Sequence, residues 1–328
     1  MKILTGDIGG TKTRLAIYQG GPGGFDPAVS EVYASREHPS LLGLAQDFLA
    51  THDMHVQAAC FGVAGPVRDG RCRTTNLPWV VEAAELSREL GIRRVFLLND
   101  LEAMAWAIPA LPSTSFALLH RGEPDPRANA ALIAAGTGLG EAGLAWDGRR
   151  LRPFATEGGH ATYGPTTDLE IELLRYLRPR YGHVSWERLV SGPGLVTLYE
   201  FLRQHRKGET PGWLAETMAE GDAASAISGA ALEGRDELAS EALDLFVHLF
   251  GCEAGNLALK VMARRGVFLG GTIAGKILPR LKSGPFLTGF TAKGRMERLL
   301  QTMPVAVLLD EAAPLLGAAV FAAEAGTG

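Results

Sequence analysis

The stretch that decides the fold is Thr5-Gly-Asp-Ile-Gly-Gly-Thr-Lys-Thr-Arg-Leu-Ala-Ile17, near the start of the chain. Apolar residues on both sides of a Gly-Gly-Thr turn predict two strands joined as a hairpin. Glycines leave backbone N–H groups bare, so phosphate oxygens can approach them closely. Asp7 precedes the turn and is a hard oxygen ligand of the type that holds Mg²⁺, often through water. The stretch therefore predicts a phosphate-binding hairpin, and an ordinary Gly-rich β-turn is the alternative.

A related pattern returns more than 100 residues later, as Ala131-Leu-Ile-Ala-Ala-Gly-Thr-Gly-Leu-Gly-Glu-Ala-Gly-Leu-Ala145. Gly136, Thr137 and Gly138 again form a bare turn between two apolar segments. Two such hairpins predict two similar domains that face each other across a cleft. Neither is a Walker loop, which runs from a strand into a helix. The segment Gly270–Lys276 matches the Walker spacing, but the Ser or Thr that would contact Mg²⁺ is missing after the lysine.

Length and composition set the limits within which a function must be sought. The chain has 328 residues and a mass of 34.9 kDa, which suits one large domain or two ordinary ones. Hydrophobic residues make up 46% and charged residues 21%, as in a soluble globular protein. A net charge of −4 and a pI near 6.1 predict no strong attraction to nucleic acid or to an anionic membrane.

Cysteine usage and the chain start both favour a cytoplasmic protein. Cys60, Cys72 and Cys252 form no CxxC pair and provide no disulfide framework, so reduced thiols are expected. The chain enters its first strand without the charged and apolar regions of a signal peptide. No uninterrupted apolar run is long enough for a membrane span, and none is expected.

Strands and helices alternate along the chain, which predicts an α/β protein. We place the main boundary near residue 110 and a return crossing near 300. The predicted domains are residues 1–110 plus about 301–328, and residues 111–300. The late strand Pro304–Leu309 and the closing helix Pro314–Ala323 are expected to fold back onto the N-terminal domain.

Asn99 and Asp100 directly follow the apolar strand 94–98. In open α/β sheets, ligands bind at the carboxyl ends of the strands, so Asp100 stands where chemistry usually occurs. A carboxylate there can accept a proton from a hydroxyl nucleophile. The alternative is structural, because an Asp before a helix is a common N-cap.

Three further polar residues complete a set that suits a sugar. Glu157 and His160 flank two glycines that let both side chains turn inward, and Glu187 is expected in the first turn of a helix capped by Ser185. The structural alternatives are a turn-stabilising Glu, a hydrogen-bonded His and a Glu that complements a helix dipole. A polyhydroxylated sugar needs many donors and acceptors, because each buried hydroxyl must be paired. Zinc is disfavoured, since the histidines lack ligand spacing and no thiolate lies near them in the sequence.

Taken together, these segments resemble the bacterial ATP-dependent glucokinases of the enterobacterial type, in the hexokinase/actin superfamily. The resemblance runs essentially end to end. It is carried by Gly6-Asp-Ile-Gly-Gly-Thr11, Leu98-Asn-Asp100, Gly136-Thr-Gly-Leu-Gly140, Glu157-Gly-Gly-His160, Gly182-His-Val-Ser185 with Glu187, Ser191-Gly-Pro-Gly-Leu195, Gly255-Asn-Leu-Ala258, Gly270-Gly271 and Leu315-Leu-Gly317. The resemblance implies a two-domain actin-like ATPase fold, of the ribonuclease H-like α/β class, with a ligand cleft between the domains.

The resemblance also implies an activity and a role for each residue. The enzyme would transfer the γ-phosphoryl group of MgATP to O6 of glucose, in the cytoplasm and as a homodimer. Asp100 would be the general base and would also bind glucose. The remaining glucose ligands would be Asn76, Asn99, Glu157, His160 and Glu187. Asp7 would organise Mg²⁺, ATP phosphates would lie on Gly9, Gly10, Thr11, Gly136, Thr137 and Gly138, and adenosine would lie by Gly270 and Gly271.

One departure separates the chain from a related branch. Sugar kinases of the repressor–kinase–open-reading-frame group carry a Cys-x-Cys-Gly-x-x-Gly-Cys zinc motif after this His, whereas Ala161-Thr-Tyr-Gly-Pro-Thr166 follows here. The alternatives left open are a kinase for another hexose or N-acetylhexosamine, polyphosphate as donor, and a catalytically inactive sugar sensor. A sugar-responsive regulator is disfavoured, because the first hairpin begins at Gly6 and leaves no room for a DNA-binding segment.

Overall fold

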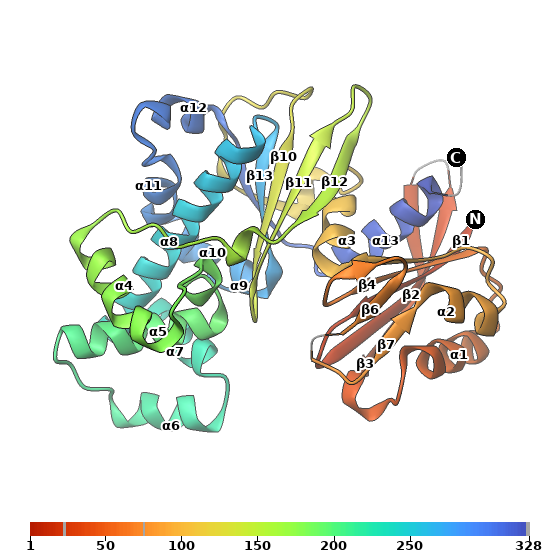
Figure 1. Cartoon of the computed structure of the whole chain (residues 1–328), viewed down its shortest axis with the longest axis horizontal. Helices are drawn as coiled ribbons and strands as arrows, with labels where there is room; N and C mark the ends of the chain where they lie inside the picture. The colour runs from red at the N-terminus through yellow and green to blue at the C-terminus, as the bar shows by residue number, and fades with distance from the viewer. Residues whose placement is uncertain (22–23, 75, 326–328) are drawn as a thin grey trace. The chain divides into compact units, whose positions relative to one another are not determined.

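The computed structural model describes residues 1–21, 24–74 and 76–325, and these divide into two compact units. The first unit comprises Met1–Ser113, Arg152–Ala155 and Asp310–Gly328. The second comprises Thr114–Leu151 and Thr156–Leu309. Each unit contains its own mixed β-sheet with helices, and together they confirm the predicted α/β fold (Figure 1).

The first unit is built on a five-stranded sheet in the order β3-β2-β1-β4-β8. β1 pairs antiparallel with β2 and parallel with β4, which in turn pairs parallel with β8. The sheet strands are β1 (Lys2–Ile8), β2 (Lys12–Gly21), β3 (Gly24–Ala34), β4 (Ala58–Val63) and β8 (Val95–Asn99). A smaller sheet contains β5 (Val67–Arg68), β6 (Arg71–Arg73) and β7 (Val80–Glu82).

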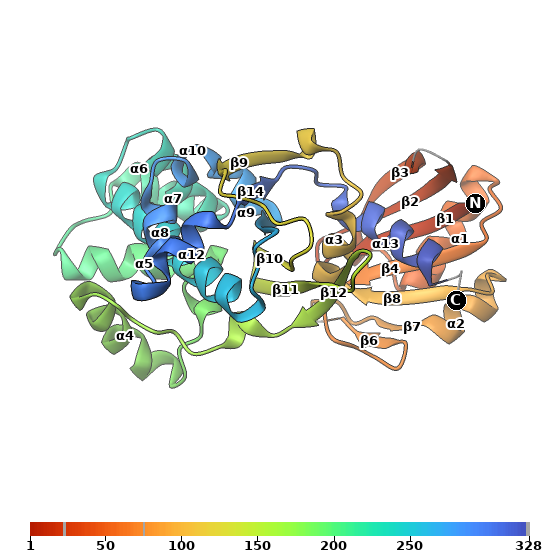
Figure 2. The ribbon, with the colours of Figure 1, turned by 90° about the horizontal axis from the view of Figure 1, so that it is seen from above.

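Helices cover both faces of this sheet because alternate strand residues point to opposite sides. Leu4, Leu15 and Phe61 pack against α1 (Leu41–His52) and α2 (Ala83–Leu90). Ile3 and Cys60 face the other way, towards α3 (Asp100–Ala107) and α13 (Ala313–Glu324). Figures 1 and 2 show α3 and α13 side by side, and Gly317 of α13 allows the close approach because its Cα lies against the Ala103 carbonyl of α3.

The second unit is built on a six-stranded sheet in the order β12-β11-β10-β13-β14-β9, although Arg152–Ala155 of the edge strand β12 are grouped with the first unit. Its strands are β9 (Phe116–His120), β10 (Ala130–Ala135), β11 (Leu139–Trp146), β12 (Leu151–Thr156), β13 (Gly266–Gly270) and β14 (Val305–Leu308). β10 pairs antiparallel with β11 and parallel with β13, and β13 pairs parallel with β14. The central strands thus repeat the arrangement of the first sheet.

Helices form most of the rest of the second unit. They are α4 (Asp168–Tyr181), α5 (Gly192–His205), α6 (Gly212–Glu220), α7 (Ala223–Leu232), α8 (Glu237–Val261), α9 (Gly271–Lys276), α10 (Leu278–Leu281), α11 (Pro285–Thr291) and α12 (Glu297–Thr302). Among the described residues α8 alone is long and apolar enough to cross a membrane, and 72% of its most apolar stretch is buried inside the protein. α8 is therefore a core helix of this unit.

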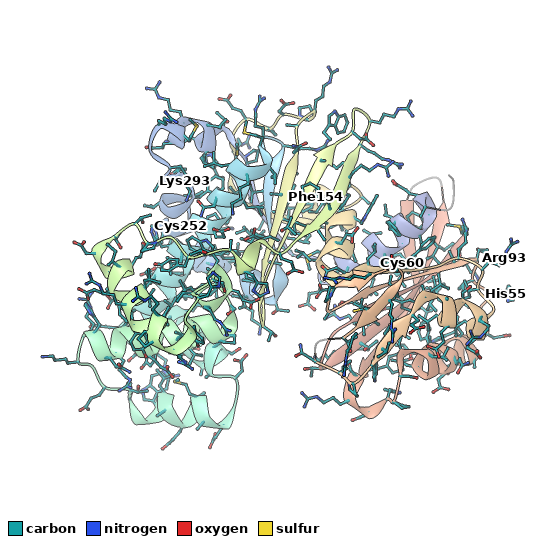
Figure 3. All side chains as sticks on the ribbon, viewed as in Figure 1. His55, Cys60, Arg93, Phe154, Cys252 and Lys293 are labelled. Atoms are coloured by element: carbon teal, nitrogen blue, oxygen red, sulfur yellow. The ribbon has the colours of Figure 1, made fainter. Side chains whose placement is uncertain are left out.

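One expectation about the late part of the chain is wrong. The strand expected over 304–309, now β14, does not fold back onto the N-terminal unit. It pairs with β13 and with β9 of the second sheet, because its fully buried residues need neighbours on both edges. The closing helix α13 does belong to the first unit. All three cysteines are free and buried, with Cys60 in β4 and Cys252 in α8 (Figure 3).

Candidate active site

The first hairpin and the strand β8 bring a turn and two carboxylates to one edge of the first sheet. β1, β4 and β8 run parallel, so their carboxyl ends lie at the same edge. Asp7 stands one residue before the end of β1, and Asp100 follows directly after β8. Burial and the negative charge of Asp100 together raise the pKa of Asp7 to about 6, while Arg14 opposes the shift. The two carboxylates are therefore close enough to repel each other.

The charge balance around Asp7 suits a hard cation. Arg14 faces Asp7 across the hairpin, but its guanidinium is bound to Glu311 at 2.8 Å. The described residues contain no group of three or more His, Cys, Asp or Glu side chains that could enclose a metal. Mg²⁺ is usually held by one or two carboxylates together with water and substrate phosphates. Asp7, supported by Asp100, fits that kind of partial site.

Two hydrogen bonds from Ser35 hold the turn 9–11 in place. The hydroxyl of Ser35 donates to the Gly9 carbonyl at 2.8 Å, and the Ser35 N–H donates to the Thr11 carbonyl at 3.0 Å. Gly10 lies against the side chain of Asn76, and a Cβ at Gly10 would stand 2.5 Å from the Asn76 Cβ. The structure thus brings Asn76, which the sequence predicts to be a glucose ligand, to the turn 9–11 that is predicted to hold phosphate.

Asn99, rather than Asp100, is the N-cap of α3. Its Oδ1 accepts hydrogen bonds from Leu101 N at 3.0 Å and Glu102 N at 3.4 Å, and its Nδ2 donates to the Gly65 carbonyl. Asp100 is the first residue of the helix, and its Oδ1 also accepts from Leu101 N, at 2.8 Å. Asn99 is therefore the N-cap, and Asp100 shares the Leu101 N–H with it. An amide group has two N–H donors, so Asn99 can still donate to a sugar hydroxyl.

In the second unit the structure groups three of the predicted sugar ligands. Nδ1 of His160 lies 3.8 Å from Glu187 Oε1, and its Nε2 lies 4.0 Å from Glu157 Oε2. The Glu157 and His160 side chains are 79% and 62% exposed, so they face solvent instead of pointing into the unit as expected. An exposed cluster of donors and acceptors can exchange water for sugar hydroxyls.

Glu187 connects this cluster with the second hairpin. Its Oε2 accepts a hydrogen bond from Leu139 N at 3.0 Å. Gly138 packs on the same carboxylate, and a Cβ there would lie 2.5 Å from Oε2. Glu187 lies in a short 3-10 turn, Trp186–Arg188, and the Ser185 side chain does not cap it, which corrects the expected helix. A single carboxylate thus fixes the turn 136–138 beside the predicted sugar ligands.

The second hairpin also borders a cavity of about 400 Å³, a volume typical of small-molecule sites. The first turns of α5 and α7 line it, and helix N-termini favour anionic groups. Its polar lining includes Thr137, Asp222, Ser225 and Lys276, and its apolar walls include Val196 and Ile273. This mixture of polar and apolar side chains suits a nucleotide, with its flat base between the apolar walls and its phosphates near the hairpin.

Gly270 and Gly271 end β13 and begin α9 beside this cavity. Gly271 has a φ of +84°, and its Cα lies against the Ala135 carbonyl, so a side chain there would be strained and would also clash. α9 starts at Gly271, so the Walker-like segment is helical rather than a phosphate loop. Its Lys276 nevertheless lines the cavity.

Sequence reasoning missed the part of the cavity formed by α7. Asp222 caps that helix through the backbone N–H groups of Ala224 and Ser225, and a hydrogen bond from the Ser225 hydroxyl lowers the pKa of the Asp222 carboxyl. An Asp directly before a small apolar run is an N-cap signal that was present in the sequence. Its link to a cavity was not visible there, because α5 and α9 come from distant parts of the chain.

Comparison with known proteins places the chain in a family. The glucokinase family model matches residues 4–325. Glucokinase of Synechocystis sp. is 42% identical over 349 residues, covering 99% of this chain and 98% of that protein. Glucokinase of Pectobacterium atrosepticum is 34% identical, covering 97% and 96%.

Solved structures agree with this result. The crystal structure of a glucokinase from an Antarctic psychrotroph matches with a TM-score of 0.87 and 31% identity, covering 98% of this chain and 99% of that chain. A ROK family glucokinase from Streptomyces griseus, solved with glucose and AMPPNP, has a TM-score of 0.66 at 22% identity and shares the fold. The predicted resemblance is confirmed: the chain belongs to the glucokinase family and is an enzyme that phosphorylates glucose with ATP.

Proposed function

We propose that the first unit supplies the chemistry of phosphoryl transfer to O6 of glucose, with Asp100 as the general base. The observation that carries this assignment is the placement of Asp100 at the carboxyl edge of the sheet, together with the helix cap provided by Asn99. Asp100 accepts the proton of the O6 hydroxyl as O6 bonds to the γ-phosphorus and the bond from phosphorus to ADP breaks. Such proton transfer contributes ~10²–10⁴ in rate.

We assign Asn76, Asn99, Asp100, Glu157, His160 and Glu187 as the glucose ligands. Asn99 and Asp100 come from the first unit, and Glu157, His160 and Glu187 from the second. Because the carboxylates and the imidazole offer acceptors and donors around a ring of hydroxyls, each sugar hydroxyl can be paired. Asn76 lies beside Gly10, so its share in sugar binding would be smaller than that of the other ligands.

The nucleotide is assigned to the cavity of the second unit, which the hairpin 136–138 borders. Gly136, Thr137 and Gly138 would hold phosphate oxygens through the backbone, as would Gly9, Gly10 and Thr11, and Gly270 and Gly271 would lie by the adenosine. Asp7 would hold Mg²⁺ through water, and the cation would neutralise charge on the phosphates. The apolar walls of the cavity favour a nucleoside donor over polyphosphate, which has no base to place between them.

The test is release of ADP from MgATP by the purified enzyme with glucose, mannose, fructose, N-acetylglucosamine or N-acetylmannosamine, and with no sugar. We expect strong turnover with glucose and a low rate in the blank. Turnover that is strongest with another sugar would move the substrate assignment. Equal rates with polyphosphate and ATP would contradict the role of the cavity.

Two further properties are proposed from the family resemblance and from the cysteines. The three buried free thiols suit a reducing compartment, so we place the enzyme in the cytoplasm. We also propose a homodimer, which light scattering coupled to gel filtration would detect as twice the mass of the chain. A mass equal to that of one chain would contradict it.

A further inference from the structure

Two carboxyl groups lie buried behind the proposed sugar ligands of the second unit. Glu141 is on β11 and is 1% exposed, and Glu253 is on α8 and is 0% exposed. The charge of Glu253 acts on the carboxyl of Glu141, so the two groups lie close to each other. Two buried carboxyl groups that lie side by side disfavour a second negative charge, which favours a proton on one of them.

The neighbours decide which member carries the proton. Glu253 accepts hydrogen bonds from Asn256 Nδ2 at 2.7 Å and from Lys260 Nζ at 3.3 Å, so both of its oxygens have partners. Oε1 of Glu141 has no partner in the described part of the protein. Burial, followed by the charge of Glu253, raises the pKa of Glu141 to about 8, with Lys260 acting in the opposite direction. Glu141 is therefore the protonated member near neutral pH.

A second lysine acts on the same group of charges. Lys293 follows α11, and its Nζ donates to the Cys252 carbonyl at 2.9 Å (Figure 3). Its charge interacts with that of Glu253, and burial lowers the pKa of this lysine. In the described part of the protein, Lys260 on α8 thus acts on both carboxyl groups, Lys293 beyond α11 acts on Glu253, and Glu170 acts on the same lysine.

Glu141 also supports the turn that carries two of the proposed glucose ligands. Gly158 packs directly on the Glu141 carboxyl, and a Cβ at Gly158 would overlap Oε2. The Thr156 hydroxyl donates to the Glu141 carbonyl at 2.9 Å and accepts from Gly158 N at 3.2 Å. Any displacement of the Glu141 carboxyl is therefore passed to the turn between Glu157 and His160.

We propose that the Glu141–Glu253 pair positions this turn for glucose, so that glucose affinity depends on the proton that Glu141 carries. Loss of the proton would place two negative charges against each other in a buried site, and the repulsion would move the Glu141 carboxyl against Gly158. A shift of about 1 Å in a positioned ligand is enough to weaken binding strongly. The inference rests on the proposed assignment of Glu157 and His160 as glucose ligands.

The experiment is calorimetric titration of the enzyme with glucose at pH 6.5 and pH 9. We expect the wild-type Kd to rise about tenfold at the higher pH, as expected for a change of one unit in a linked pKa. Glu141→Gln keeps a neutral donor to Glu253 at every pH, so its Kd should stay near the wild-type value at pH 6.5. Glu141→Leu removes the donor and should bind glucose about tenfold more weakly at both pH values.

Two controls separate the possible failures. Leu243→Ala opens a cavity in the core face of α8 and should lower the Tm while leaving the pH dependence of glucose binding unchanged. Glu157→Gln tests the ligand assignment itself, and unchanged glucose binding in that variant would remove the basis of the proposal. If Glu157→Gln weakens binding but Glu141→Gln keeps the wild-type pH dependence, the positioning role of Glu141 is wrong. A wild-type Kd that is constant with pH would also overturn it.

Discussion

The two sheets share one arrangement of central strands and differ in what stands at the strand ends. In the first, the hairpin β1–β2 is followed by the parallel strands β4 and β8, and in the second β10–β11 is followed by β13 and β14. The penultimate residue of β1 is Asp7, whereas that of β10 is Ala134. The first unit thus holds charged groups at its turn, and the second holds bare backbone beside a cavity.

This difference indicates that the two units have different functions, with chemistry in the first and nucleotide binding in the second. The first unit would contribute the proton acceptor and the cation site, and the second would contribute the nucleotide cavity and three of the six sugar ligands. Substitutions in the first unit should then lower kcat with modest effects on binding. Substitutions in the second unit should alter the KM for ATP, the affinity for glucose or the stability of the enzyme.

The largest effect is expected for Asp100→Asn. The amide cannot accept the O6 proton, so kcat should fall about 10³-fold. The glucose Kd should stay within about threefold, because the amide oxygen still accepts a hydrogen bond. Steady-state kinetics and calorimetry on one preparation check both values, and a kcat near that of the wild type would remove the base assignment.

Asp7→Asn should lower kcat by about 10²-fold at saturating MgATP, since it removes a charged ligand of the proposed cation site. The same change removes the repulsion with Asp100, so the Tm of the unliganded enzyme should rise by a few degrees. A loss of activity together with a gain in Tm would support a functional role for Asp7 that is absent from the corresponding position in the second sheet. A variant that loses stability along with activity would indicate that Asp7 has a structural role instead.

A matched pair of glycines tests the second unit. Gly271→Ala should destabilise the enzyme by about 1–3 kcal/mol, because φ is positive there and the Cβ meets the Ala135 carbonyl. Gly136→Ala meets no atom within 4 Å, so its Tm should not change. Any rise in the KM for ATP in Gly136→Ala would then report contact with the nucleotide. Thermal melts and ATP titrations of both variants provide the measurement.

A smaller effect is expected from the cavity lining that the sequence did not reveal. Lys276→Ala should raise the KM for ATP about three- to tenfold, since a hydrogen bond to a charged group contributes roughly 1 kcal/mol or more. The KM for glucose should be unchanged. An equal rise in both constants would indicate that the cavity does not bind the nucleotide alone.

The smallest effect concerns stability and pH. Because the native state keeps a proton on Glu141 up to about pH 8, whereas the unfolded chain releases it near 4.5, stability should fall as the pH rises between these values. Glu141→Gln cannot ionise, so its stability should decline by at least about 1 kcal/mol less over this range. Urea unfolding at several pH values measures the difference, and parallel curves for the two proteins would contradict the expectation.

Features governed by local sequence were predictable. The hairpins followed from glycine-rich turns between apolar segments, and Asp100 was placed by the strand that precedes it. Features that depend on distant partners were not. β14 was assigned to the wrong unit because its neighbours, β13 and β9, are set by long-range pairing.

The sequence also did not show which of two adjacent polar residues caps a helix. Asn99 and Asp100 can both cap a helix, and only the backbone geometry shows that Asn99 does so. The buried pair Glu141–Glu253 gave no signal, because a glutamate on a strand and another on a helix far along the chain have no visible relation in the sequence.

The separation of chemistry and binding between the two units is tested most directly by measuring kcat and glucose Kd for Asp100→Asn and Glu157→Gln side by side. We expect Asp100→Asn to lose about 10³-fold in kcat and to keep its glucose affinity. We expect Glu157→Gln to lose glucose affinity and to keep more of its kcat at saturating glucose. If both variants lose affinity and turnover to the same extent, the separation of chemistry and binding between the two units is wrong.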